Sequence, residues 1–361
     1  LDIQCLHGRA ADLVFHCCTP PLAPRLALHL LLRCWAPSSC PRHSVPSLPP
    51  RQTLAGWSRA QEVAQWKLRK GRVARGGREP VVRETLVFIL AGGKGNRLMP
   101  LTRYRSKPAV PFGSQYRIID FTVSNCINSG LRRIYVLTQY KSNSLAWHVR
   151  YAYGHHFVPE AGHFLTTVPP QQLTSEDWYR GTADAVYQNF QFLQAIAPRF
   201  ALILAGDHVY KMNYGSLIEF HASRAAHVTV AVVETPIDRA RKQFGVLELD
   251  EDGRVVSFVE KPEDPVPTPH NPRTCFSSMG IYVFNTDVLE DVLVEDAHDP
   301  ESGHDFGRDI LPRIHKSLRV FGYSFIDSAT GAPCYWRDVG TLEQYYDANI
   351  DLITPLPALN L

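Results

Sequence analysis

The stretch Phe88-Ile89-Leu90-Ala91-Gly92-Gly93-Lys94-Gly95-Asn96-Arg97-Leu98 joins an apolar run to a glycine-rich basic loop. The apolar run, residues 86–91, has the length and composition of one buried β-strand. Glycines directly after a strand permit positive φ angles and let backbone N–H groups approach a ligand closely. Because Lys94 and Arg97 add cationic donors, the stretch predicts a phosphate-binding loop; the alternative is a tight surface turn with solvated charges.

The composition is that of a globular chain with two unlike parts. With 361 residues, 45% of them hydrophobic and 20% charged, the chain can form one large α/β domain or two smaller ones. Residues 1–83 hold 13 Lys and Arg against 4 Asp and Glu, whereas residues 84–361 hold 25 against 31. The mildly acidic second part argues against a nucleic-acid-binding surface. No run approaches the roughly 18 apolar residues that a membrane-spanning helix needs.

The first part lacks a lasting hydrophobic period and is interrupted by many prolines. We therefore expect residues 1–80 to be a poorly ordered extension outside the core, or upstream sequence read into the protein. The apolar run at residues 26–32 faintly resembles a signal sequence, and the arginine-rich composition also fits an organellar transit peptide. A short helix is possible over residues 61–69. An alternative for this segment is a metal site formed by Cys34, Cys40 and His43.

The cysteines are distributed unevenly. Five of the eight lie in the first forty residues, and the remainder of the chain has only Cys126, Cys275 and Cys334, which are widely spaced. This pattern predicts free, buried thiols in a reduced, cytoplasmic compartment.

A second basic segment follows the glycine loop. Residues 97–107 carry four cations, and the prolines at 108 and 111 stiffen the backbone that presents them. An exposed basic loop is one interpretation. The other is that these side chains complete a polyphosphate site, because Arg97 suits forked contacts with phosphate and Lys107 suits a point-charge contact.

The next elements complete a strand–loop–helix–strand unit. Apolar spacing predicts a helix over residues 118–130, and residues 134–137 form a second buried strand. A ligand loop after the first strand of such a unit is a nucleotide-binding arrangement. Gln139, at the end of the second strand, can bind a base or cap the following helix. Residues 148–176 contain four histidines but show no period, so we expect a surface loop rather than a metal site.

Two carboxylates follow later strands. Arg180-Gly181-Thr182 leads into a helix expected over residues 182–197 and forms a second anion-friendly surface. The strand predicted over residues 201–208 carries Asp207 at its carboxyl end, where ligands lie in open parallel sheets. Asp207 can hold Mg²⁺, with a helix cap or turn as the alternative, and Asp338 places a second carboxylate before a final helix.

A β-hairpin is predicted over residues 244–262 around the turn Glu251-Asp252-Gly253. It ends on Glu260 and Lys261, which are either a solvated pair or a pair that binds sugar hydroxyls and a phosphate. The other elements expected here are a helix over 214–225, strands over 228–233 and 277–284, a helix beginning at Asp305 and a helix over 342–352.

Taken together, these stretches resemble the bacterial glucose-1-phosphate adenylyltransferases, also called ADP-glucose pyrophosphorylases. The glycine loop alone would indicate only a sugar nucleotidyltransferase. The runs Trp-Tyr-Arg-Gly-Thr-Ala-Asp-Ala and Ser-Asn-Cys-Ile-Asn-Ser-Gly are much more specific to the adenylyl enzymes. The matching runs appear in family order at residues 90–98, 106–110, 117–121, 124–130, 178–185, 204–208, 258–262, 278–284 and 335–341.

The resemblance implies an α/β, Rossmann-like nucleotidyltransferase fold with a mixed, mostly parallel sheet and helices on both faces. It places the catalytic domain at residues 84–355 and the start of a linker at 356–361. Family members continue into a C-terminal β-helix domain and form homotetramers. That domain is absent from this sequence, so the family's assembly and allosteric control are expectations that depend on it.

The implied reaction is ATP plus α-D-glucose 1-phosphate giving ADP-glucose plus pyrophosphate, the committed step of glycogen biosynthesis. The sugar-phosphate oxygen would attack the α-phosphate in line, and no general base is required because the nucleophile is already an anion. The resemblance implies the following roles: Gly92, Gly93, Gly95, Arg97 and Lys107 on the triphosphate; Gln139 near adenine or coupled to a regulatory site; Tyr179, Gly245, Glu260, Lys261 and Ser278 on glucose 1-phosphate; Asp207 and Asp338 on Mg²⁺.

Three positions depart from the family pattern. Asn96 stands where the family loop usually has threonine. Tyr104 stands where some enterobacterial enzymes carry an activator-binding lysine, and Pro111 stands where they carry a histidine. The resemblance therefore does not predict which effector binds. The alternatives are a nucleotidyltransferase that uses UTP or dTTP, and a non-catalytic regulatory paralogue. A dinucleotide oxidoreductase ranks last because the loop does not complete the Gly-x-Gly-x-x-Gly pattern.

Overall fold

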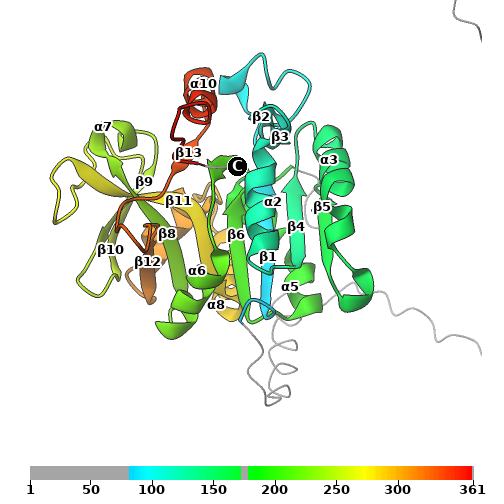
Figure 1. The fold of residues 1–361 in the computed structure, drawn as a ribbon. Coiled ribbons are helices and arrows are strands. Elements are labelled where there is room, and N and C mark those ends of the chain that lie inside the picture. The colour runs from blue at the N-terminus through cyan, green and yellow to red at the C-terminus, as the bar shows by residue number, and fades with distance from the viewer. Residues whose placement is uncertain (1–80, 172–177, 360–361) are drawn as a thin grey trace, which may run out of the picture. The chain divides into compact units, whose positions relative to one another are not determined.

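The computed structural model describes residues 81–171 and 178–359 (Figure 1). The predictions made for residues 1–80 lie outside the described residues; these include the leader-like run, the helix over 61–69 and the alternative metal site at Cys34, Cys40 and His43. Across the two described ranges, none of the helices has both the length and the apolar composition needed to cross a lipid bilayer.

The core of the structure is a nine-stranded mixed sheet. One half is parallel, with β1 paired to β4 and β6, and β4 paired to β5. Antiparallel pairing is gathered around β11, which contacts β6, β8 and β9. The strands are β1 (Thr85–Ala91), β4 (Arg133–Thr138), β5 (Phe164–Val168), β6 (Phe200–Ala205), β8 (Val228–Pro236), β9 (Gly245–Leu249), β10 (Val255–Glu260), β11 (Thr274–Asn285) and β12 (Val320–Ser324).

Helices cover both faces of this sheet. Val87 and Ile89 of β1 pack in one apolar cluster, whereas Leu86 and Phe88 pack in another on the opposite face. The uninterrupted apolar run of β1 is needed because both of its faces are buried. The first cluster includes residues of α2 (Ile118–Asn128), α3 (Asn143–Tyr153) and α6 (Tyr214–Ser223), and Figure 1 shows α2 and α6 in front of the strands. The second includes residues of α4 (Thr182–Tyr187), α5 (Phe190–Ile196), α8 (Thr286–Ala297) and α9 (Leu311–Ile314).

A third, smaller apolar cluster lies over the carboxyl edge of the parallel strands. Val110 and Phe112 meet Val209, Val339 and Ala348 there. These residues join two short sheets to the last helix, as the top of Figure 1 shows. The elements involved are β2 (Pro111–Phe112), β3 (Tyr116–Arg117), β7 (His208–Tyr210), β13 (Trp336–Asp338) and α10 (Leu342–Asp351). Short turns of helix complete the description: η1 (Asn96–Leu98), η2 (Lys107–Ala109), η3 (Gly154–His156), η4 (Pro159–Ala161), α7 (Ile237–Ala240) and the π-turn η5 (Phe306–Ile310).

The main sequence predictions are confirmed. The β1–loop–α2–β4 unit, the β9–β10 hairpin and the mixed α/β sheet all form. Of the three cysteines in the described chain, all are free; Cys126 and Cys275 are buried, and Cys334 is only half-buried.

The prediction of a surface loop over residues 148–176 is wrong for much of its described part. α3 continues to Tyr153, and β5 adds an edge strand to the sheet. β5 pairs in parallel with β4, and only Val168 at its end is fully buried. Its short Phe-Leu-Thr-Thr-Val run was too brief to show a period by itself, and pairing with β4 supplies the hydrogen bonds that make it a strand.

Three further boundaries differ from the predictions. The helix expected over residues 182–197 is two helices, α4 and α5, separated at Gln188 and Asn189. The strand expected over residues 201–208 stops at Ala205, where Gly206 bends the chain. A Cβ at Gly206 would lie 2.9 Å from Ile119 Cδ1 and 3.1 Å from the Leu90 carbonyl oxygen, so glycine at this bend allows close packing against α2 and β1. Asp305 begins η5 rather than a regular α-helix.

Candidate active site

A cavity of about 700 Å³ opens at the carboxyl edge of β1, β4 and β6. The open edge of parallel strands is where ligands bind in doubly wound folds. All the site residues predicted from the sequence except Gly95 line this cavity: Gly92, Gly93, Arg97, Lys107, Gln139, Tyr179, Asp207, Gly245, Glu260, Lys261, Ser278 and Asp338.

Gly95 does not line the cavity but determines the conformation of the glycine loop. Its φ is 65°, in the left-handed region, and it precedes η1. A Cβ there would lie 3.0 Å from Thr102 Cγ2 and 3.1 Å from Lys107 Cβ. The Thr102 hydroxyl donates a hydrogen bond to the Gly95 carbonyl at 2.8 Å, which closes the turn. Glycine at this position therefore satisfies both a backbone and a packing requirement.

The remaining loop glycines face the cavity. A Cβ at Gly93 would meet nothing within 4 Å, and a Cβ at Gly92 would lie 3.1 Å from Gln139 Cβ. Lys94 Nζ lies over the ring of Tyr140, 4.9 Å from its centroid. Arg97 is exposed, and no carboxylate in residues 81–171 or 178–359 forms an ion pair with it. This side of the cavity thus presents open backbone and an available guanidinium.

Three side chains from distant parts of the sequence meet at the centre of the cavity. Lys107 Nζ lies 2.9 Å from Asp207 Oδ2 and 3.0 Å from Asp338 Oδ1. The lysine comes from η2, Asp207 from the bend after β6, and Asp338 from β13. Pairing between β13 and β7 sets Asp338 opposite His208, which explains how the second carboxylate reaches the first.

The charges in this cluster stabilise one another. Burial would lower the pKa of Lys107, but the attraction of Asp207 and Asp338 outweighs it, and the pKa is raised. Burial would raise the pKa of Asp207, but Lys107 and His208 outweigh it and lower the pKa to about 2. The lysine is therefore cationic and Asp207 is anionic at neutral pH.

His208 was missed by the sequence analysis, although it directly follows Asp207. Its Nε2 lies 3.5 Å from Asp207 Oδ1 and 3.9 Å from Asp338 Oδ1. Its buried Nδ1 has no hydrogen-bond partner among the described residues. Ligand atoms of Asp207, His208 and Asp338 all lie within 4.8 Å of one another, so the three could hold a metal ion. The two carboxylates are hard oxygen donors of the kind that Mg²⁺ prefers.

The opposite side of the cavity is built around Glu260 and Lys261. Lys261 Nζ lies 2.5 Å from Glu260 Oε1. Glu260 Oε2 occupies a narrow space, because a Cβ at Gly245 would lie 2.8 Å from it and a Cβ at Gly307 would lie 2.9 Å from it. The carboxylate is therefore held by close backbone on two sides, while the ammonium, on a side chain 57% exposed, reaches into solvent.

Tyr179 and Gln139 connect the two sides. The Tyr179 hydroxyl accepts a hydrogen bond from Asn189 Nδ2 at 2.9 Å. Burial raises the pKa of Tyr179, so the phenol stays neutral. Gln139 Nε2 donates to the Tyr179 carbonyl at 3.5 Å. Gln139 thus lines the cavity and does not cap the following helix, which was the alternative drawn from the sequence.

Other lining residues were not predicted. Phe306 and Gly307 of η5 lie in the cavity wall together with Asp305, the residue directly before η5, and Trp336 of β13 lies there too. The sequence around Asp305 predicts only the start of a helix, and Trp336 stands out only as a neighbour of Asp338. Contacts between segments far apart in the chain place them here.

Comparison with known proteins agrees with this architecture. The nucleotidyl transferase family model matches residues 86–354. A glucose-1-phosphate adenylyltransferase from Rhodopirellula baltica is 52% identical over 288 residues, which are 80% of this chain and 64% of the relative. One from Paramagnetospirillum magneticum is 52% identical over 285 residues, covering 78% and 66%. Glucose-1-phosphate adenylyltransferase 2 from Vibrio cholerae is 50% identical over 282 residues, covering 78% and 69%. The chain thus spans slightly less than two thirds of the first two of these relatives.

Proposed function

The chain belongs to the nucleotidyl transferase family, and from this premise we propose that it transfers the adenylyl group of ATP to glucose 1-phosphate. The products are ADP-glucose, a precursor for glycogen, and pyrophosphate. An oxygen of the sugar phosphate attacks the α-phosphorus of ATP, and the bond from that phosphorus to the bridging oxygen of the pyrophosphate breaks. Atoms and charge balance without a general base, because the attacking oxygen is already anionic.

One observation carries this proposal. The Lys107–Asp207–Asp338 cluster lies in one cavity between an open glycine loop and the Glu260–Lys261 pair. Two phosphorylated substrates need such a centre, because the reaction depends on orientation and on neutralising charge. A cavity of about 700 Å³ lies within the usual range of small-molecule sites.

On the nucleotide side, backbone and cations would bind the triphosphate. Gly92 and Gly93 would bind phosphate oxygens; the space beside Gly93 is open, Gln139 packs beside Gly92, and Gly95 keeps the loop in the required turn. Arg97 would stabilise the departing pyrophosphate, and Lys107 would contribute a point charge beside it. Gln139 would lie near the adenine.

On the sugar side, Glu260 would accept hydrogen bonds from glucose hydroxyls. Lys261 would bind the sugar phosphate, since its ammonium reaches into solvent beside the carboxylate. Tyr179 and Ser278 would supply neutral hydroxyls to the sugar, and Gly245, which also lines the cavity, leaves the space that the Phe258 ring and the Glu260 carboxylate fill.

Asp207 and Asp338 would hold Mg²⁺. Their ligand atoms are close enough and are hard oxygens, so the donor set fits the ion. Bound there, Mg²⁺ would neutralise phosphate charge and help to orient the transferring group. Lys107 Nζ lies between the same two carboxylates. The lysine and the metal ion would therefore compete for the carboxylate oxygens of Asp207 and Asp338.

The test is pyrophosphate release by the full chain with Mg²⁺ and glucose 1-phosphate. ATP, UTP and dTTP are compared at equal concentration, each with a control lacking the sugar phosphate. We expect ATP to be preferred and release to require the sugar phosphate. Preference for UTP or dTTP would support the other sugar nucleotidyltransferases. Nucleotide binding without turnover would support a regulatory paralogue.

A further inference from the structure

We propose that Asp296 and His304 form a buried positioning pair that fixes the sugar-phosphate side of the cavity. The inference rests on the function proposed above, since it assigns a task to residues outside the cavity. Neither residue lines the cavity, yet both are connected to residues that do.

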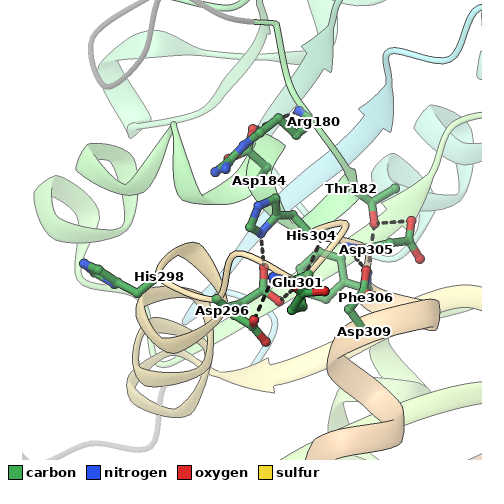
Figure 2. Close-up of polar contacts among 12 residues, drawn as sticks. Arg180, Thr182, Asp184, Asp296, His298, Glu301, His304, Asp305, Phe306 and Asp309 are labelled. Carbon is green, nitrogen blue, oxygen red and sulfur yellow. Dashed lines mark hydrogen bonds and ion pairs between the residues drawn. The ribbon is translucent and has the colours of Figure 1, made fainter.

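Figure 2 shows the His304 ring directed at the Asp296 carboxylate. His304 Nδ1 lies 2.9 Å from Asp296 Oδ2, and the two side chains are only 5% and 3% exposed. With the carboxylate oxygen as the acceptor, the imidazole donates from Nδ1. Ser302 Oγ donates to the other carboxylate oxygen at 2.7 Å and accepts from the His304 backbone N–H at 2.9 Å. The end of α8 therefore anchors the following loop through its side chains.

This anchoring holds an unusual backbone conformation. His304 has a φ of 56°, in the left-handed region that residues other than glycine seldom adopt. Its carbonyl accepts a hydrogen bond from Ala183 N at 2.8 Å, and Asp184 N lies 3.4 Å away. The loop thus caps the first N–H groups of α4, which follow the cavity residue Gly181.

Contact between this loop and the start of α4 is backbone to backbone. A Cβ at Gly181 would lie 2.2 Å from the His304 carbonyl oxygen and 2.4 Å from the Gly303 carbonyl oxygen. Since Gly181 and Thr182 line the cavity, a shift of the His304 carbonyl moves the wall directly.

A second connection runs from the same loop to the sugar side. Thr182 Oγ1 donates to Asp305 Oδ2 at 2.9 Å and accepts from Phe306 N at 3.0 Å (Figure 2). Asp305 Oδ1 in turn accepts from Gly307 N at 2.9 Å. Gly307 packs against Glu260. A continuous series of contacts therefore connects Asp296 with the Glu260 carboxylate, which is proposed to bind glucose.

A buried polar pair is a poor way to gain stability, because desolvation offsets most of its attraction. Its advantage here is to specify one loop conformation. Displacing a substrate by about 1 Å can cost on the order of 100-fold in rate, so such a constraint is useful at the wall of an active site.

Two substitutions at one position separate the side-chain contact from the backbone requirement. His304→Gly adopts the left-handed conformation freely but cannot reach Asp296. His304→Asn also tolerates that conformation and keeps an N–H donor close to the position of Nδ1. We expect His304→Gly to raise the KM for glucose 1-phosphate by about tenfold or more, with the KM for ATP within about twofold. His304→Asn should restore much of the difference.

His221→Ala is the matched control, because it removes another buried histidine that does not line this cavity. It should lower the stability and leave both KM values unchanged. A general loss of folded enzyme would lower the apparent kcat of any variant. It would not raise the KM for glucose 1-phosphate relative to the KM for ATP.

Hydrogen exchange of the substrate-free protein provides a readout that does not depend on the reaction. The amides of Ala183, Asp184 and Phe306 should exchange faster in His304→Gly than in the wild type or His304→Asn. Unchanged exchange in a folded His304→Gly variant, or KM values that rise equally for both substrates, would overturn the positioning role. Absence of turnover in the wild type would instead count against the proposed function, and the exchange result would still decide the role of the pair.

Discussion

The ammonium of Lys107 donates a hydrogen bond to Asp207 at 2.9 Å, although the two residues are 100 positions apart in the chain. The same ammonium lies 3.0 Å from Asp338, so one lysine bridges two carboxylates that could hold a cation. In the free protein, the lysine occupies the space between these two carboxylates and attracts both of them.

Replacing this lysine should therefore strengthen metal binding in the absence of nucleotide. Lys107→Met removes a positive charge about 3 Å from both carboxylates, where even a screened interaction amounts to several kcal/mol. We expect Mn²⁺ to bind at least about tenfold more tightly, measured by the loss of the free-ion EPR signal, while turnover falls by about 100-fold or more. Lys242→Met, which removes an exposed ion pair with Glu263, should change neither quantity. Equal Mn²⁺ affinity in Lys107→Met and wild type would mean that the lysine does not compete with the ion.

Asp207→Asn should abolish turnover with little loss of stability. The change is nearly isosteric and leaves Asp338 as the partner of Lys107, but it removes one hard anionic ligand. The expected fall in kcat is about 1,000-fold, checked by pyrophosphate release together with a thermal melt. Asp264→Asn, at a carboxylate 91% exposed, is the control. Normal turnover in a folded Asp207→Asn variant would remove this residue from the proposed metal site.

The loop glycines should divide into one that serves binding and one that serves folding. Gly93→Ala places a methyl group in open cavity space, so we expect unchanged stability and a KM for ATP raised by about tenfold. Gly95→Ala introduces a Cβ at a positive φ and against Thr102, and should cost about 1–2 kcal/mol of unfolding free energy. Chemical denaturation and steady-state kinetics of both variants test this division. Equal loss of stability at both positions would contradict it.

The stability of the protein should fall below pH 6.5 because of His221. Burial is the main cause that lowers the pKa of His221 to about 4, with smaller effects of Arg199 and His227 in the same direction. The unfolded chain therefore binds a proton that the folded protein excludes, and stability present above pH 6.5 is lost as the pH falls toward 4. The loss from this residue should be about 2 kcal/mol between pH 7.5 and pH 5.

Urea denaturation across this range measures the loss. His221→Ala should reduce the pH dependence by a similar amount, whereas His270→Ala, at a side chain 60% exposed, should not. An unchanged slope in the His221 variant would show that other groups cause the effect.

Much of the fold was predictable because its signals are local. The apolar run of β1, the turn of the β9–β10 hairpin and the spacing of α2 depend on neighbouring residues and survive in any context. β5 and the division between α4 and α5 were not predictable, because a short strand is decided by its partner and a helix end by packing around it.

The sequence by itself determined which residues are suited to bind phosphate. It also determined the strand and the glycine loop that carry these residues. Residues adjacent in the chain settle that geometry through backbone freedom and hydrogen bonding. Only the tertiary structure decided that Lys107 bridges Asp207 and Asp338, that Glu260 lies between Gly245 and Gly307, and that the His304 carbonyl caps α4. Most of these contacts join segments far apart in the chain, up to the 231 positions between Lys107 and Asp338, and they form only when burial of the two sheet faces brings the strand ends to one edge.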